Sequence, residues 1–288
     1  MDKQKTRKAA PQLIGRAAAW VAQRASEERL HTVAAGMRRF ALCAVLSRGV
    51  TPGGYAPFGL AMAAAMMARG AGLSVIGGVF CGAMLLGASP KSGVYAAAAL
   101  LVLCVMNVCA GWKVMEKRWF APAVAALAGA ACTFVFLPAG GALRAADVLA
   151  FAAAQGLTFL SCMVYGAAAA PPREQEDWRR PATLLTITAT VLLSLADMDV
   201  FSLLAPARVL ALLVVLAAAY LGGPAVGAAS GVVFGAAMDL AAGQGALFTC
   251  CYGLCALVAG AFRGQGRTWF ALCALASGLC ASMLGVDH

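Results

Sequence analysis

Histidine and acidic residues are scarce in this sequence. Its 288 residues include two histidines and twelve Asp or Glu side chains. Both histidines, His31 and His288, lie outside the apolar segments of the chain. A buried Ser-His-Asp triad and a histidine-ligated metal are therefore excluded there. A lipid-modifying enzyme is disfavoured because it needs His, Asp or Glu clusters at the membrane interface. We expect no catalytic residue, no metal and no cofactor.

Charged residues of both signs are also few. Charged residues make up 12% of the chain and hydrophobic residues 62%. A soluble domain of this length could not cover so much apolar surface with so few charges. Long apolar runs broken by short polar segments are typical of a polytopic membrane protein. The fold class we expect is all-α, a polytopic transmembrane helical bundle with about nine to ten crossings.

The basic residues are concentrated at the N-terminus. Residues 1–39 carry nine Lys or Arg and three acidic residues. Their local charge of +6 (9 − 3) is more than half of the net charge of +10. The basic part is too long for a secretory signal, and no clear cleavage site follows it. We expect residues 1–39 to be a cytoplasmic arm that lies against anionic lipid, with an amphipathic helix over 11–39. Nucleic acid is the competing partner for this charge, and membrane attachment explains the charge without it.

The apolar body, residues 40–288, divides into segments long enough to cross a bilayer. Nine later segments follow an irregular first one, 40–68, and they are 71–88, 93–111, 119–139, 147–170, 181–197, 203–220, 224–242, 245–263 and 268–285. Segment 40–68 contains a cluster of Gly and Pro over 49–57, which predicts either one broken helix or a re-entrant hairpin. Non-helical backbone at membrane depth must be covered by other helices, so we expect 49–57 to be buried in protein.

The loop charges decide between these two alternatives. If 40–68 returns to the inner face, inner loops carry nine Lys or Arg and outer loops carry three, Lys91, Arg144 and Arg208. If 40–68 crosses once, the counts reverse. The positive-inside rule therefore favours the hairpin, with a cytoplasmic N-terminus and a C-terminus outside.

Eleven cysteines do not form a recognisable ligand pattern. Most lie inside apolar segments, where cysteine acts as a small hydrophobic residue. The densest group, Cys250, Cys251 and Cys255, has neither a C-x-x-C spacing nor a nearby histidine, which argues against a metal site.

Glycines repeat at a spacing of four residues in segment 224–242. Gly223, Gly227, Gly231 and Gly235 share one helix face, and Asp239 continues it. A face without side-chain bulk lets a neighbouring backbone approach closely, so we expect tight helix packing. A glycine-lined path for a solute is the alternative. A shorter version of the face is formed by Ser74, Gly78 and Gly82.

Three charges lie within or beside the apolar segments. Asp239 is either a buried functional carboxylate or a solvated residue at the interface. Arg48 precedes the Gly and Pro cluster, and Arg208 lies near the start of segment 203–220. The sequence neither shows nor excludes a buried ion pair between Arg48 and Asp239.

Two stretches resemble a known family. One is residues 47–52 (SRGVTP) leading to 57–61 (PFGLA), and the other is 207–210 (ARVL) followed by 220–233 (YLGGPAVGAASGVV). Their order and setting resemble the N-terminal membrane region of stage II sporulation protein E of spore-forming bacteria. The resemblance spans roughly residues 35–285, and its motifs are glycine patterns, not catalytic signatures.

The resemblance implies a membrane anchor, homo-oligomerisation and a place at the asymmetric sporulation septum, where the intact protein contacts division-ring proteins. In that family a metal-dependent serine/threonine phosphatase follows and activates the forespore sigma factor by dephosphorylating an anti-anti-sigma factor. The phosphatase aspartates are missing here, so we expect a partial, non-catalytic chain with no small-molecule substrate. A small-solute transporter is the alternative, although paired broken helices are not evident in two related halves.

Overall fold

The computed structural model describes residues 30–51, 53–86, 91–136, 144–168, 179–196, 206–242 and 245–284. Within these ranges the chain is helical, and the single β-bridge joins Thr51 to Tyr55. Helix 30–46 comes first. It is followed by α2 (Pro57–Met67), α3 (Leu73–Met84), α4 (Ser92–Val108), η1 (Lys113–Glu116), α5 (Phe120–Thr133), η2 (Phe134–Phe136), α6 (Ala145–Ala168), α7 (Arg179–Leu195), α8 (Pro206–Gly222), α9 (Pro224–Ala242), α10 (Leu247–Ala261), η3 (Arg263–Gln265) and α11 (Arg267–Leu284).

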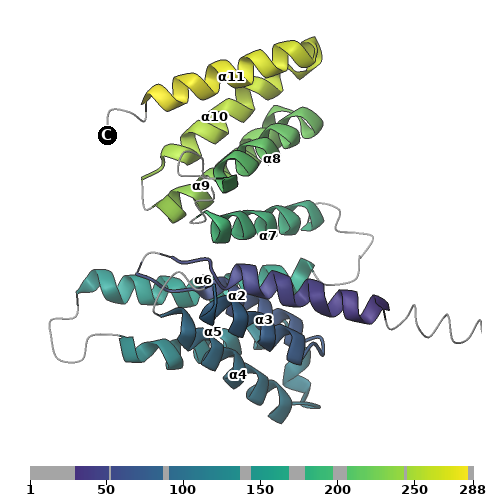
Figure 1. The fold of residues 1–288 in the computed structure, drawn as a ribbon, viewed down its shortest axis with the longest axis vertical. Helices are drawn as coiled ribbons and strands as arrows, with labels where there is room; N and C mark the ends of the chain where they lie inside the picture. The colour runs from purple at the N-terminus through teal and green to yellow at the C-terminus, as the bar shows by residue number, and fades with distance from the viewer. Residues whose placement is uncertain are drawn as a thin grey trace, which may run out of the picture.

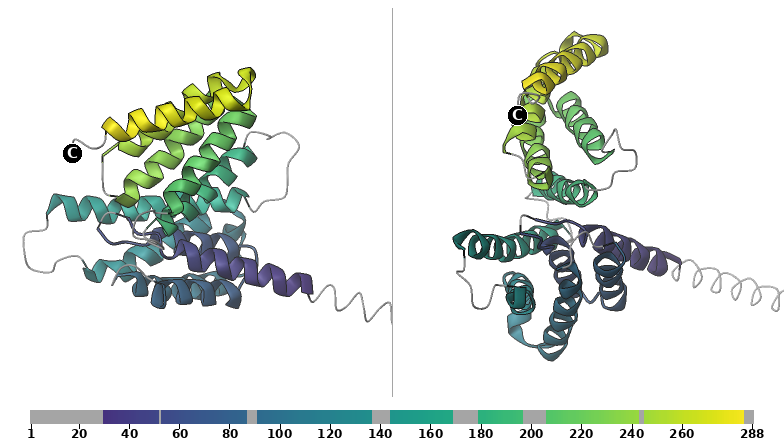
Figure 2. Two further views of the ribbon diagram at one scale, coloured as in Figure 1. Left: turned by 45° about the horizontal axis from the view of Figure 1, so that its top comes forward. Right: turned by 60° about the vertical axis from the view of Figure 1, so that its left-hand side comes forward.

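The helices form two groups, each with its own apolar core (Figure 1). Helix 30–46 and α2–α6 form most of the first core, to which α7 adds Leu193, and α7–α11 enclose the second. The two groups lie one above the other in all three views, with α6 and α7 facing each other between them (Figure 2). Helix 30–46 also runs across the boundary at residue 39 that separated the basic arm from the apolar body.

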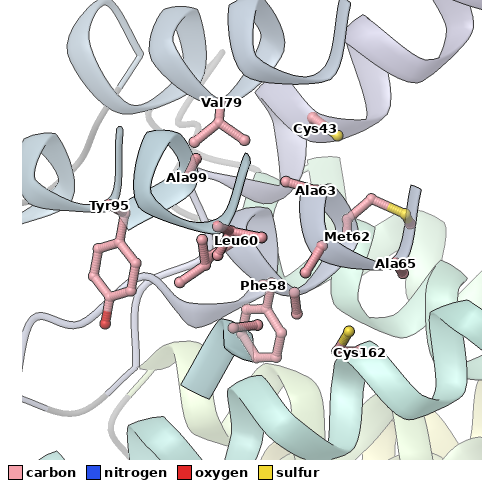
Figure 3. Close-up of a cluster of buried hydrophobic side chains, with 14 of the residues drawn as sticks. Cys43, Phe58, Leu60, Met62, Ala63, Ala65, Val79, Tyr95, Ala99 and Cys162 are labelled. Atoms are coloured by element: carbon pink, nitrogen blue, oxygen red, sulfur yellow. The ribbon is translucent and has the colours of Figure 1, made fainter. Parts of the chain in front are cut away.

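Helix α2 is the centre of the first group. Of its eleven residues all but Met66 are buried, and α3, α4, α5 and α6 pack around it. Figure 3 shows Phe58, Leu60 and Met62 of α2 among side chains from helix 30–46, α3, α4 and α6. Pro57 starts the helix at a position where a missing N–H costs nothing. The helix is only about 16 Å long, so neighbouring helices must cover both of its ends.

A compact turn separates helix 30–46 from α2. The Thr51 N–H donates to the Tyr55 carbonyl at 2.7 Å, and the Thr51 hydroxyl donates to the same oxygen at 3.1 Å. Gly53 and Gly54 have φ values of 90° and 81°, which only glycine adopts without strain. Lys91 closes the turn, because its Nζ donates to the Gly53 carbonyl at 2.8 Å and lies 4.4 Å from the Tyr55 ring centroid. Gly49, Thr51 and Tyr55 are buried, as the sequence predicted for this cluster, whereas Gly53 is exposed.

Most of the helices are shorter than the predicted spans. Among the described residues, two helices have the length and hydropathy to cross a membrane, Ala145–Ala168 with 24 residues and Pro224–Ala242 with 19. Seven shorter apolar helices accompany them. The predicted span 71–88 is a twelve-residue helix, which begins only after Gly70 adopts a φ of 81°. The predicted number of crossings therefore does not follow from helix length, because helices packed inside a bundle need not each span the bilayer.

Helix α7 is rich in hydroxyl groups that bond to its own backbone. Thr186 donates to the Ala182 carbonyl at 2.9 Å, and Thr188 donates to the Leu184 carbonyl at 2.8 Å. Ser194 donates to the Thr190 carbonyl at 2.7 Å. Such bonds to the carbonyl four residues earlier satisfy hydroxyl groups where no water is present. The threonines are therefore compatible with an apolar setting.

A hydrogen bond connects the two helix groups at α6 and α7. The buried Tyr165 hydroxyl of α6 donates to Thr190 Oγ1 of α7 at 2.8 Å. Nearby, Gly49 faces Ser194 so closely that an added Cβ would lie 2.6 Å from its Oγ. The junction between the groups therefore combines a polar bond with close packing.

Removing this hydroxyl should weaken the junction. We expect Tyr165→Phe to lower the free energy of unfolding by about 1 kcal/mol, the typical contribution of one interhelical hydrogen bond in a membrane protein. Unfolding of the detergent-solubilised protein, followed by circular dichroism, measures the change. Tyr220→Phe is the matched control, because Tyr220 is 39% exposed and contacts Phe270 through its ring. Equal stability of the two variants would contradict the assignment.

Candidate helix-packing site

The glycine face of α9 lies directly against the backbone of α10. A Cβ added to Gly231 would lie 2.5 Å from the Tyr252 carbonyl oxygen and 2.8 Å from the Gly253 nitrogen. One added to Gly235 would lie 2.5 Å from the Phe248 carbonyl oxygen. Real Cβ atoms do not approach other atoms so closely, so only glycine permits this spacing. The backbone of α10 occupies the face, which leaves no room beside these glycines for a solute path.

The start of the same face joins α9 to α8 and α10. Gly227 packs on Ala219 of α8, where an added Cβ would lie 2.5 Å from the Ala219 Cβ. Gly223 forms the turn between α8 and α9 with a φ of 88°. Gly260 of α10 completes the contact, since its added Cβ would lie 2.7 Å from the Pro224 Cα. Sequence reasoning missed Gly260, although its spacing of seven residues from Gly253 could have indicated a second small-residue face.

Asp239 caps the N-terminus of α10 from α9. Its Oδ1 accepts the Phe248 N–H at 2.7 Å, and its Oδ2 accepts the Thr249 N–H at 2.8 Å and the Thr249 hydroxyl at 2.6 Å. The first N–H groups of a helix lack partners within the helix and carry a partial positive charge. Ala246, the residue at the cap position, has no side chain that could bind them. The Asp239 carboxylate of α9 therefore accepts the N–H bonds that the N-cap side chain of α10 would normally accept.

Asp239 is buried, with 7% of its surface exposed, and so differs from the solvated interface residue of the second alternative. Its oxygens bind α10 and not Arg48, and the Arg48–Asp239 pair is not formed. The Arg48 side chain is partly buried, and its Nε has no hydrogen-bond partner. The physical reason is that backbone N–H groups of the adjacent helix already satisfy the carboxylate.

Arg208 lies at the start of α8, beside the same helix end. Its guanidinium carbon is 5.1 Å from the Phe248 ring centroid, and its backbone carbonyl accepts the Tyr252 hydroxyl at 3.1 Å. The residue itself is exposed. Arg208 thus links α8 to the start of α10 through an aromatic ring and a carbonyl.

The second small-residue face packs α3 on helix 30–46. An added Cβ on Gly78 would lie 2.5 Å from the Phe40 carbonyl oxygen, and one on Gly82 would contact Ala44. Ser74 lies further along, with its Cβ 4.0 Å from a Cβ added to Gly36. Gly59 of α2 faces Ser47 in the same way, a contact that the sequence gave no spacing signal to find.

The described residues contain no group of three His, Cys, Asp or Glu side chains that could bind a metal ion. Cys255, from the densest cysteine group, is buried and accepts a hydrogen bond from Ser277 of α11 at 3.2 Å. The arrangement is therefore one of helix packing.

Adding a single methyl group to the glycine face should loosen it. We expect Gly231→Ala to lower the free energy of unfolding by about 1–3 kcal/mol, because the Cβ meets backbone atoms of α10 that cannot move aside. Thermal unfolding in detergent measures the change. In the control variant, Gly156→Ala, the added Cβ has nothing within 4 Å. Equal midpoints for the two variants would contradict the packing assignment.

Neutralising the cap should destabilise α10. We expect Asp239→Asn to lower the free energy of unfolding by about 1.5–3 kcal/mol, because one amide oxygen replaces two charged oxygens that accept three hydrogen bonds. The yield of folded protein from membranes and its unfolding midpoint test this. Asp147→Asn removes the same charge from an exposed position in the first turn of α6 and should change both quantities much less, because its interaction with the helix end is screened by solvent. If both variants behave alike, Asp239 does not act as a cap.

Comparison with protein families assigns the chain. The family model described as "SpoIIE, N-terminal domain" matches residues 2–286. No curated protein and no solved structure matches the chain significantly. The matched region is the membrane-associated, non-catalytic part of stage II sporulation protein E, consistent with the apolar helices described above. The chain therefore belongs to the family of SpoIIE N-terminal domains.

Proposed function

We propose that this chain is the membrane anchor and localisation module of a sporulation phosphatase. In the intact protein the phosphatase activates the forespore sigma factor by dephosphorylating an anti-anti-sigma factor at the asymmetric septum. The observation that carries the proposal is the family match over 2–286, on a chain whose described residues are apolar packed helices. The module acts by holding its partners in the membrane, with no reacting group of its own.

Contacts between loops support a bundle of alternating helix directions. The Arg69 side chain, just after α2, donates to the Gly166 carbonyl near the end of α6 at 2.5 Å. Arg263, just after α10, donates to the Leu221 carbonyl near the end of α8 at 3.4 Å. The ends of α2 and α6 therefore lie together in the first group, and the ends of α8 and α10 lie together in the second. Arginines near helix C-termini also complement the helix dipole.

The opposite side is defined by two further contacts. Lys91, before α4, binds the Gly53 carbonyl before α2, and Arg208 at the start of α8 lies over Phe248 at the start of α10. Helix 30–46 runs parallel to α3, because Gly78 faces Phe40 and Gly82 faces Ala44. In Figure 1 helix 30–46 begins on the right and α11 ends on the left. Helix 30–46 and α2 then form the re-entrant hairpin, with the turn near the outer side.

The charges orient this bundle in the membrane. With alternating helix directions, the sequence assigns nine Lys or Arg to the side where α2, α6, α8 and α10 end and three to the other side. By the positive-inside rule the first side is cytoplasmic, and so is the start of helix 30–46. The remaining partners that we propose are a second copy of the chain, division-ring proteins and, at residues 1–39, anionic lipid.

Imaging in sporulating cells tests the function. A green fluorescent protein fused to the N-terminus should concentrate at the asymmetric septum of a spore-forming bacterium. Fluorescence also tests orientation, because this reporter does not become fluorescent when it is exported through the general secretory pathway. Uniform fluorescence around the cell membrane would contradict the localisation role.

A pair of variants connects localisation to the glycine face. Replacing both Gly231 and Gly235 by Leu should reduce septal enrichment, because α10 can no longer approach α9. The Gly156→Leu fusion is the control, since that position has open space around it. Immunoblots of the membrane fraction establish whether each fusion is present in equal amount.

A further inference from the structure

The connection between α4 and α5 exposes two tryptophans with three cations between them. Trp112 and Trp119 are 60% and 50% exposed. Lys113, Lys117 and Arg118 are exposed as well, against the single acid Glu116. We propose that this connection, residues 112–119, is a binding site for anionic phospholipid in the cytoplasmic leaflet. The proposal rests on the membrane placement and orientation given under Proposed function.

The backbone of residues 112–119 is held in a defined shape. The helix η1 covers Lys113–Glu116, and successive turns are closed by N–H bonds from Met115 to the Trp112 carbonyl at 3.0 Å and from Lys117 to the Val114 carbonyl at 3.1 Å. Met115 packs against the first apolar core. Met115 faces the protein, whereas the cations and tryptophans are exposed. The site is therefore formed before any lipid arrives.

The position of these residues fits a headgroup layer. Val108, at the end of α4, is 72% exposed. Its side chain would lie in the hydrocarbon layer next to the headgroups. Tryptophan rings favour the membrane–water interface, where one edge is apolar and the other is wet. The Lys117 Nζ lies 5.8 Å from the Trp119 ring centroid, so a cation and a ring meet at one depth. A lipid phosphate can bind the cations while its acyl chain passes the ring.

Two other cations on the same side have protein partners. Arg69 binds the Gly166 carbonyl, and Arg263 binds the Leu221 carbonyl. Three exposed cations against one acid make residues 112–119 complementary to a negative surface. Each Lys or Arg close to an anionic surface favours it by about 1 kcal/mol, or about five-fold.

Fluorescence quenching by brominated lipids tests the proposal. The full chain carries five tryptophans, and replacing Trp20, Trp178 and Trp269 by Phe leaves Trp112 and Trp119 as reporters. The protein is reconstituted into vesicles in which either phosphatidylglycerol or phosphatidylcholine is brominated at the same mole fraction. We expect several-fold stronger quenching by the anionic lipid, decreasing at high salt because mobile ions screen exposed charges.

Charge-removing variants assign the effect to this site. Replacing Lys113, Lys117 and Arg118 by Gln should bring the ratio of the two quenching efficiencies to about one, since the favourable charge is gone. Arg118→Gln alone should lower the ratio, whereas Arg144→Gln, a matched change at an exposed cation near α6, should not. Equal quenching by both lipids in the protein that retains only Trp112 and Trp119 would overturn the lipid site. A quenching ratio that does not change with salt concentration would also overturn it, and both results leave the membrane placement intact. Absence of quenching by either lipid would instead overturn the membrane placement under Proposed function.

Discussion

Close backbone contact between α9 and α10 is the constraint on which the second half of the molecule depends. Between helices surrounded by lipid there is no hydrophobic force comparable to that in water, so packing and hydrogen bonds must hold them together. Gly231 and Gly235 bring the α10 backbone against α9, and Asp239 binds the first N–H groups of α10. The two features act together, because the carboxylate reaches those N–H groups only when the helices are this close.

The first half meets the same requirement with different residues. Gly78 and Gly82 place α3 against helix 30–46, and Gly59 places α2 against Ser47. Here the charged residue that fixes the chain is Lys91, which binds the Gly53 carbonyl in the turn before α2. The halves meet at α6 and α7, where the Tyr165–Thr190 hydrogen bond lies within otherwise apolar packing.

Sequence reasoning predicted the helical class and the existence of most helices, because long apolar runs and four-residue glycine spacing depend on local sequence. It could not predict the role of Asp239, because its partners are N–H groups of Phe248 and Thr249, and these come near only after α9 and α10 pack. For the same reason the sequence could not decide whether Asp239 forms an ion pair with Arg48, since sequence alone does not show which groups lie near a carboxylate in the fold. Helix lengths were overestimated, because an apolar run continues through turns such as the one at Gly70.

The shortness of α2 has a consequence for how the protein is made. Its eleven residues cannot bridge the hydrocarbon layer, and its ends are covered by helices as distant in the chain as α6. During synthesis α2 leaves the ribosome about a hundred residues before α6 is complete, while its polar ends still lack cover. The cover of α2 is therefore complete only once α6 has been synthesised, so the first half of the molecule can close only at a late step.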